Sequence, residues 1–279
     1  MTTQPASHYI TLCGREVHYV EWGRRDQPPL IMWHGVARTG RDFDDLASAL
    51  ADRRHIIVPD TIGRGLSQWS PDPHGEYNTP FYARQAVELL DQLGLETVDW
   101  IGTSMGAITG IRAAAGDLHG RVRRMVLNDM GPIIAQAALD RIRSYAGAPP
   151  RFERVSELEG YFRQIYKPYG FLTDTQWRRM TESSVRRLPD GGVTTHFDPM
   201  IKLHFETNEE QWDNWDKLTC DMLCLRGETS DLLLVEDAAR MEARNPRCKV
   251  VTIGGCGHAP ALNVPDQIEL VSNFINAGV

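Results

Sequence analysis

A serine in the segment Gly102-Thr103-Ser104-Met105-Gly106 has the surroundings of a nucleophile. The segment matches the pattern G-x-S-x-G, in which small residues allow a sharp turn between a strand and a helix. The turn exposes the serine hydroxyl, and the first N–H groups of the helix lie near the reacting centre. An apolar run at 98–101 and an Ala-rich stretch after Gly106 predict that strand and helix. We therefore predict that Ser104 is a nucleophile.

A serine hydroxyl needs a base to take its proton, and His258 is the predicted base. It lies in the glycine-rich segment 254–260, directly after the last expected strand. Such a loop can carry an imidazole over the ends of the strands. The order of nucleophile, acid and histidine along the chain favours His258 over the other candidates, which are His34, His55, His196 and His204.

The base in turn needs a carboxylate that fixes its tautomer and stabilises the imidazolium ion. Asp231 follows an expected strand and lies between the nucleophile and the base in the sequence. Glu228, in the same loop, and Asp129, after the expected strand 122–127, are the alternatives. We predict Asp231 in preference to both.

The negatively charged oxygen of a tetrahedral intermediate needs two N–H donors. The residue after the nucleophile, Met105, supplies one, and we predict Val36 as the second because Gly35 allows the chain to bend there. Together these groups predict acyl transfer through an acyl-enzyme, which water activated by the histidine then hydrolyses. Esters are the expected substrates, because an amide nitrogen must be protonated as it leaves.

Short strands alternate with helices through most of the chain. Expected strands are 8–13, 16–22, 30–33, 55–58, 98–101, 122–127, 222–225 and 249–253. Expected helices are 42–51, 79–93 with Thr79 as its cap, the stretch from Gly106 to about 117, 235–244 and 265–275. This alternation predicts a mostly parallel sheet with helices on both faces. Ligands bind such sheets beyond the carboxyl ends of the strands, where the candidate residues fall.

The alternation stops between about residues 131 and 218. The patterns there are helical, at 135–145, 155–166, 175–188 and 209–218, and no strand pair is predicted. We predict a helical insertion: a core formed by 1–131 and 219–279, and a cap formed by 132–218. The candidates for contact with a substrate are one loop histidine and three aromatic residues of the cap: His34, Phe171, Trp177 and Phe197.

Five ordered motifs give the sequence a family resemblance. They are His34-Gly35, Pro59-Asp60-x-x-Gly63-x-Gly65-x-Ser67, Gly102–Gly106, Leu225-Arg226-Gly227 leading to Asp231, and Gly257-His258. Through these five motifs the chain resembles the α/β-hydrolase superfamily, and the resemblance covers nearly its whole length. The resemblance implies an eight-stranded, mostly parallel sheet flanked by helices, with a helical cap after the sixth strand. The stretches 34–43 and 127–132 look most like small bacterial carboxylesterases, some of which are reported to act on polyester oligomers.

Other activities of the same architecture stay open. Haloalkane dehalogenases and epoxide hydrolases resemble one another in having Asp at the position of the nucleophile. This chain has Ser104 there, which argues against both activities. A carbon–carbon hydrolase of ring-cleavage products shares the Ser-Met-Gly sequence and needs cations for a carboxylate, which Arg38, Arg178 and Arg179 offer. A lactonase or thioesterase uses the same triad. A ligand receptor can also retain it, with slow or incidental turnover.

Composition narrows the class of protein. The formal net charge is −7 and no long basic run is present, which argues against nucleic-acid binding. We expect no secretory signal in the N-terminal residues, which lack a basic stretch followed by an apolar one, and no membrane span, because no apolar run is long enough. Five irregularly spaced cysteines predict reduced thiols and a cytoplasmic location. No metal or cofactor motif is found, so we expect no cofactor. The expected partner is a small-molecule ester substrate. The oligomeric state, monomer or dimer, stays open.

Overall fold

A computed structural model describes residues 4–146, 148–205 and 210–278. Its centre is an eight-stranded sheet in the order β1-β2-β4-β3-β5-β6-β9-β10. The strands are β1 (Ala6–Leu12), β2 (Arg15–Trp22), β3 (Pro29–Trp33), β4 (His55–Pro59), β5 (Val98–Thr103), β6 (Val122–Asn128), β9 (Asp221–Gly227) and β10 (Cys248–Ile253). The pairs β1–β2 and β2–β4 are antiparallel and the others parallel, which confirms the predicted fold class.

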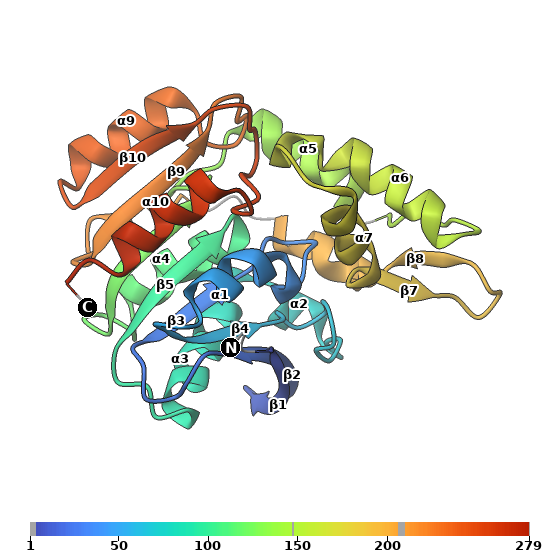
Figure 1. Cartoon of the computed structure of the whole chain (residues 1–279), viewed down its shortest axis with the longest axis horizontal. Helices are drawn as coiled ribbons and strands as arrows, with labels where there is room; N and C mark the ends of the chain where they lie inside the picture. Colours follow the sequence, from blue (N-terminus) through green and yellow to red (C-terminus); the bar gives the residue numbers. More distant parts are fainter. Residues whose placement is uncertain (1–3, 147, 206–209, 279) are drawn as a thin grey trace.

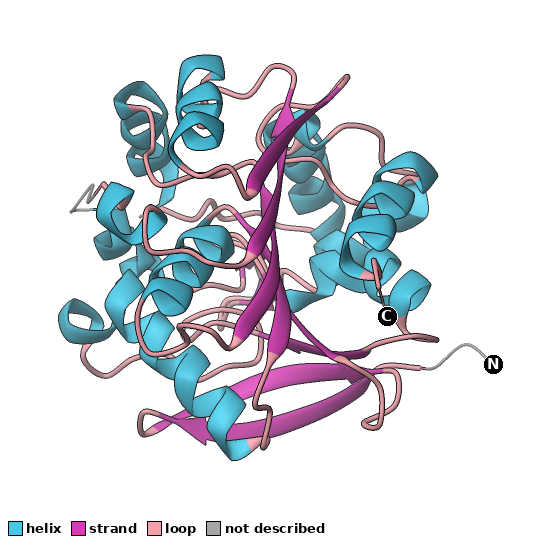
Figure 2. Ribbon diagram, turned by 90° about the vertical axis from the view of Figure 1, so that its left-hand side faces the viewer, coloured by secondary structure: helices cyan, strands magenta, loops and turns pink. Residues whose placement is uncertain are grey.

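Helices cover both faces of this sheet (Figure 2). They are α1 (Asp44–Leu50), α2 (Pro73–Glu76), α3 (Thr79–Gln92), α4 (Met105–Ala115), α9 (Val235–Arg244) and α10 (Pro265–Ile275), with a 3₁₀ turn η1 (Gly40–Phe43) before α1. Successive residues of a strand face opposite sides. Trp100 of β5 therefore packs in the apolar core that α3 and α4 cover, whereas Ile101 packs in the core that α1 and α10 cover.

The cap of α3 differs from the prediction. The side chain of Asn78, and not that of Thr79, accepts the N–H of Phe81, at 2.9 Å. Thr79 is the first residue of the helix and Pro80 follows within its first turn. The reason is backbone geometry, because the extended conformation that a capping residue needs occurs at Asn78.

The chain between β6 and β9, which we call the inserted segment (residues 132–218), lies to one side of the sheet (Figure 1). It contains α5 (Gln136–Ala146), α6 (Val155–Ile165), η2 (Lys167–Tyr169), α7 (Asp174–Glu182), β7 (Val185–Arg187), β8 (Val193–Thr195), η3 (Pro199–Phe205) and α8 (Trp212–Trp215). Residue 209 of the expected helix 209–218 lies outside the described residues. The division of the chain into a core and a cap domain stays a prediction.

The absence of a strand pair from the inserted segment was predicted wrongly. Strands β7 and β8 form an antiparallel hairpin, and the expected helix 175–188 ends at Glu182. Gly191, with φ of 86°, forms the turn, and the β-branched Val193 packs with Leu158 and Trp177 in a small core of this segment. A turn that needs a left-handed residue and β-branched residues beside it favour strands over another helical turn.

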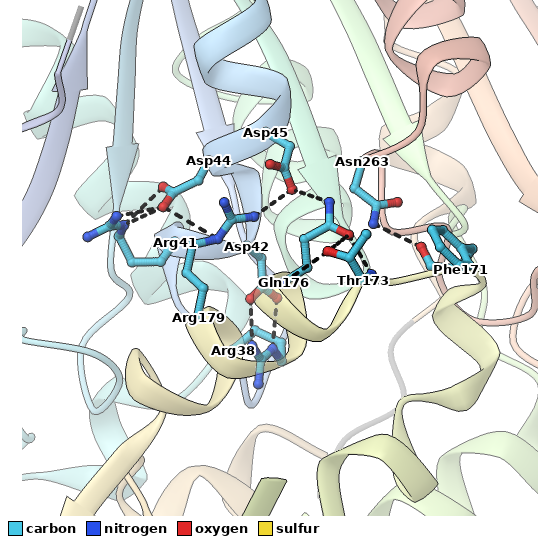
Figure 3. A network of polar contacts seen from close by, with 10 residues as sticks. All are labelled: Arg38, Arg41, Asp42, Asp44, Asp45, Phe171, Thr173, Gln176, Arg179 and Asn263. Carbon is cyan, nitrogen blue, oxygen red and sulfur yellow. Dashed lines mark hydrogen bonds and ion pairs between the residues drawn. The ribbon is translucent and has the colours of Figure 1, made fainter.

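Polar contacts join the inserted segment to the core at α1 (Figure 3). The carboxylate oxygen Oδ2 of Asp45 accepts from Nε2 of Gln176 at 2.9 Å and from Nη2 of Arg179 at 2.5 Å. Asn263 donates to the carbonyl oxygen of Phe171 at 2.9 Å. One carboxylate of the core thus holds two side chains of α7.

We expect Asp45→Ala to loosen α7 without unfolding the core. A half-exposed ion pair contributes up to about 1 kcal/mol, so amide hydrogens of α7 should exchange roughly fivefold faster. Hydrogen-exchange mass spectrometry measures this. Asp26→Ala is the control, because it removes an exposed ion pair with Arg24 in the loop between β2 and β3. Equal exchange in α7 of Asp45→Ala and the wild type would contradict the expectation.

Candidate active site

Ser104 stands at the predicted junction of a strand and a helix, between β5 and α4. Its backbone has φ of 53° and ψ of −115°, a conformation that side chains other than glycine rarely adopt. A Cβ at Gly102 would clash with the backbone of Gly106, and one at Gly106 with the carbonyl of Trp33. The two glycines therefore allow strand and helix to approach closely enough to expose the hydroxyl.

His258 joins this serine to a carboxylate. Its Nε2 lies 2.9 Å from Oγ of Ser104, and its Nδ1 lies 2.8 Å from Oδ2 of Asp129. A ring with the carboxylate at Nδ1 presents Nε2 to the hydroxyl as a proton acceptor. The structure thus brings the predicted nucleophile and base together, and the carboxylate at the ring is Asp129, where the sequence predicted Asp231.

Asp129 is held from several sides. It is fully buried at the end of β6, and its N–H donates to the carbonyl of Leu225 in the neighbouring strand. Its Oδ1 accepts the N–H of Gly227 at 2.7 Å, and its Oδ2 accepts the hydroxyl of Ser230 at 2.5 Å. These donors fix the carboxylate in the orientation that His258 needs.

Asp231 is exposed and lines the same cavity as Ser104 and His258. The prediction of this residue as the orienting acid was wrong for a physical reason. The loop after β9 supplies Ser230 as a donor to the buried Asp129. The other alternative, Glu228, accepts the N–H of Gly255 at 3.0 Å. Chain order could not separate the candidates, because Asp129 also lies between the nucleophile and the base.

The predicted oxyanion donors border the nucleophile. Within the described residues, the N–H groups of Val36 and Met105 have no hydrogen-bond acceptor. Val36 lines the cavity beside Ser104. Nε of Arg64 donates to the carbonyl of Val36 at 2.8 Å, which holds this loop in place. Both N–H groups are thus available to an oxygen that gains negative charge.

A cavity of about 380 Å³ opens over Ser104 and His258. The inserted segment supplies much of its wall, through Ile142, Ile165, Tyr166, Pro168 and Tyr169. None of these five residues was predicted from the sequence. The sequence Tyr166-Lys167-Pro168-Tyr169-Gly170 carries a usable signal, because a proline after a helical pattern ends the helix and leaves a turn near the core.

The aromatic residues predicted to contact substrate lie elsewhere. Phe171 is 70% exposed and stands outside the lining of this cavity. Trp177 packs inside the inserted segment against Leu158 and Met180, and Phe197 packs in the main core with Ile201. The structure gives those predictions no support, because large apolar side chains serve cores as readily as pockets.

The turn η2 also holds the loop that carries the base. The carbonyl of Pro168 accepts the N–H of Gly257 at 2.7 Å, and the carbonyl of Tyr169 accepts the N–H of Ala261 at 3.1 Å. These bonds lie on either side of His258. The inserted segment therefore contributes to the position of the imidazole as well as to the cavity wall.

His34, the fourth predicted substrate contact, bonds to two loops of the core, and its contact with a substrate stays a prediction. Its Nδ1 lies 2.6 Å from the carbonyl of Gly35, and its Nε2 accepts the N–H of Thr61 at 2.9 Å. The ring thus ties the loop after β3 to the loop after β4. Burial lowers its pKa to about 4, which keeps it neutral. It lines a separate, smaller cavity near Asp42 and Asp45.

Buried neutral histidines predict that acid destabilises the fold. Burial lowers the pKa of His34 to about 4 and of His196 to about 3, whereas the unfolded value is 6.5. Below pH 6.5 the unfolded chain binds more protons, so the free energy of unfolding should fall with pH. Each histidine can lower the free energy of unfolding by at most about 1.4 kcal/mol per pH unit. Burial raises the pKa of Asp44, which acts in the opposite sense and reduces the slope.

Urea unfolding at pH 6.5, 5.5 and 4.5 measures this slope. His196→Asn should reduce it, because the proton that His196 takes up on unfolding no longer contributes; the buried His34 and His204, whose pKa burial lowers as well, keep the rest of the slope. Asparagine retains an acceptor for the N–H of Gly65, which His196 Nδ1 accepts at 2.8 Å. Stability that stays constant or rises on acidification would show that the histidines are not buried as described.

Known proteins resemble this chain in sequence and in fold. The sequence profile of the alpha/beta hydrolase family matches residues 30–269. A 3-hydroxybutyrate-oligomer hydrolase from Cupriavidus necator is 37% identical over 271 residues, covering 92% of this chain and 91% of the relative. A 2-(acetamidomethylene)succinate hydrolase from Mesorhizobium japonicum is 27% identical over 256 residues, covering 90% and 88%. The structure of an alpha/beta hydrolase from Novosphingobium aromaticivorans superposes with a TM-score of 0.88 at 32% identity and covers 99% of both chains.

Proposed function

Because the chain belongs to the alpha/beta hydrolase family, we propose that it is a serine hydrolase that cleaves carboxylic esters through an acyl-enzyme on Ser104. The observation that carries the proposal is the continuous line of hydrogen bonds from Ser104 through His258 to the buried Asp129. This arrangement activates a hydroxyl for attack on an acyl carbon. The cavity above it gives a substrate access to the hydroxyl.

The proposed reaction has two halves. Oγ of Ser104 attacks the ester carbonyl while Nε2 of His258 takes its proton, and the new oxyanion accepts from the N–H groups of Val36 and Met105. The imidazolium then gives the proton to the departing alcohol, which leaves the acyl group on Ser104. Water, deprotonated by His258, attacks the acyl-enzyme and releases the acid. Asp129 stabilises the imidazolium in both halves.

Short oligomers of hydroxyacids are the proposed substrate class. The relative from Cupriavidus necator is named as a hydrolase of 3-hydroxybutyrate oligomers, and its similarity extends over most of both chains. The cavity has apolar side chains, Ile142 and Ile165, beside the hydroxyl-bearing Tyr166 and Tyr169. Such a wall suits an aliphatic chain interrupted by ester groups.

Hydrolysis of nitrophenyl butyrate and of the linear 3-hydroxybutyrate dimer tests the proposal, with fluorophosphonate labelling located by mass spectrometry. We expect turnover of both esters and a label on Ser104. A label on Ser104 without turnover of either ester would reject ester hydrolysis and favour a carbon–carbon hydrolase or a receptor. Neither a label nor turnover would reject the serine mechanism itself.

A further inference from the structure

One nitrogen of Arg38 is buried without a partner. The side chain is 3% exposed, and its Nε and Nη2 donate to the two carboxylate oxygens of Asp42 at 2.7 and 2.6 Å. Within the described residues, Nη1 has no hydrogen-bond partner. Figure 3 shows the third guanidinium nitrogen pointing away from Asp42. A buried charged donor without an acceptor is costly, so a ligand that supplies an acceptor gains by binding there.

This arginine lines the cavity that contains the nucleophile. A Cβ built on Gly35 would lie 3.8 Å from both Cγ of Arg38 and Cβ of Ser104, so the two side chains flank this glycine. The guanidinium carbon lies 4.8 Å from the ring centre of Tyr166, another residue of the cavity wall. The stacked ring and the Asp42 carboxylate fix the plane of the guanidinium group.

The guanidinium group stays charged in this position. Burial alone would lower the pKa of Arg38, yet the adjacent Asp42 carboxylate raises it above its ordinary value. Asp42 satisfies one edge of the group and leaves Nη1 as a charged donor. Asp231, an acidic residue, lines the same cavity.

The other arginines considered from the sequence do not reach this cavity. Arg179 donates to Asp45 at the contact between α7 and α1. Arg178, beside it on α7, is exposed. Neither is among the described residues that line the cavity over Ser104. Arg38 is therefore the arginine among these three that a bound substrate can meet.

We propose that Nη1 of Arg38 binds a free carboxylate of the substrate, so that the preferred esters carry a carboxylate close to the bond that is cleaved. This rests on the proposed ester hydrolysis and narrows its substrate class. In an oligomer of a 3-hydroxyacid, four covalent bonds separate the last ester carbonyl carbon from the terminal carboxylate carbon, about 5 Å when extended. The side chains of Arg38 and Ser104 both border Gly35, so the arginine lies close enough to the nucleophile for such a spacing.

A matched pair of substrates tests the proposal on the unmodified protein. We expect kcat/KM for the linear 3-hydroxybutyrate dimer to exceed that for its methyl ester by tenfold or more, since a hydrogen bond to a charged group is roughly that strong. Free 3-hydroxybutyrate should also inhibit hydrolysis of nitrophenyl butyrate more strongly than methyl 3-hydroxybutyrate does. A ratio near one, or no turnover of either dimer by a protein that hydrolyses nitrophenyl butyrate, would overturn the inference and leave ester hydrolysis intact. No hydrolysis of any ester would instead reject the proposed function.

Arg38→Met identifies the group responsible. We expect the preference for the acid over the methyl ester to fall at least tenfold. The ratio compares two substrates on one sample, so a reduced fraction of folded protein cancels. Arg41→Met is the control, because Arg41 forms a similar ion pair with Asp44 in the same loop but stands outside the cavity over Ser104. An unchanged ratio in Arg38→Met, or an equal loss of the preference in Arg41→Met, would overturn the role of Arg38. If Arg38→Met is inactive, the wild-type ratio of kcat/KM and the comparison of the two inhibitors decide whether the inference stands.

Discussion

We expect Asp129→Asn to lower kcat for ester hydrolysis about 10⁴-fold, and Asp231→Asn to lower it less than tenfold. The carboxylate of Asp129 accepts from Nδ1 of His258, and an amide in its place can donate to that nitrogen instead. The ring then carries its proton on Nε2 and cannot take one from Ser104. Asp231 lies on the exposed wall of the cavity, so its amide changes the local charge and leaves the tautomer unaffected.

Steady-state kinetics of both variants on nitrophenyl butyrate measure the difference, and circular dichroism with urea unfolding confirms that each is folded. Glu228→Gln is a second control, because Glu228 lies in the same loop as Asp231 and bonds to Gly255. A large loss in Asp231→Asn with a small one in Asp129→Asn would place the acid in the loop after β9 and reject the geometry described above.

We expect Ser104→Ala, which lacks the proposed nucleophile, to lower kcat roughly 10⁵-fold or more and to take up no fluorophosphonate label. The remaining rate comes from water attack on an ester polarised by the N–H groups of Val36 and Met105. His258 and Asp129 contribute little once Ser104 is absent, because the three groups act as a unit. Ester turnover within tenfold of the wild type would mean that another residue is the nucleophile.

Ser104→Gly is the matched control, since it also lacks the hydroxyl. Glycine tolerates a φ of 53° and a ψ of −115°, whereas alanine keeps the strain of a Cβ there. We expect Ser104→Gly to be as inactive as Ser104→Ala and more stable in urea by about 1 kcal/mol. Equal stability of the two variants would show that the turn is not strained.

The sharp turn at Ser104, the proposed nucleophile, could be predicted from sequence because its constraint is local. Gly102 and Gly106 are required by contacts within five residues and with one neighbouring strand, so the pattern alone implies the turn. His258, the proposed base, could be predicted for a similar reason, because the glycine-rich loop around it is visible in the sequence. The mostly parallel sheet could be predicted from the alternation of strands and helices, because each of these elements is long enough to show its hydrophobic period.

The acid and the cavity wall depend on contacts distant in sequence. Asp129 and Asp231 both follow strands and both lie between Ser104 and His258, and only the path of the loop after β9 decides which meets the imidazole. Trp177 looks the same in sequence whether it lines a pocket or packs in a core. The strands of the β7–β8 hairpin have three residues each, too few for an alternating pattern to be read.

The two carbonyls of η2 that hold the loop around His258 limit how this protein can be re-engineered. Because the inserted segment lines the cavity, one way to change the specificity is to replace it with the corresponding segment of another protein between β6 and β9. Such a chimera would keep Ser104, His258 and Asp129, yet it would lose the acceptors for Gly257 and Ala261 unless the donor chain supplied carbonyls at the same places. A graft made to change the substrate would therefore first lower the turnover rate.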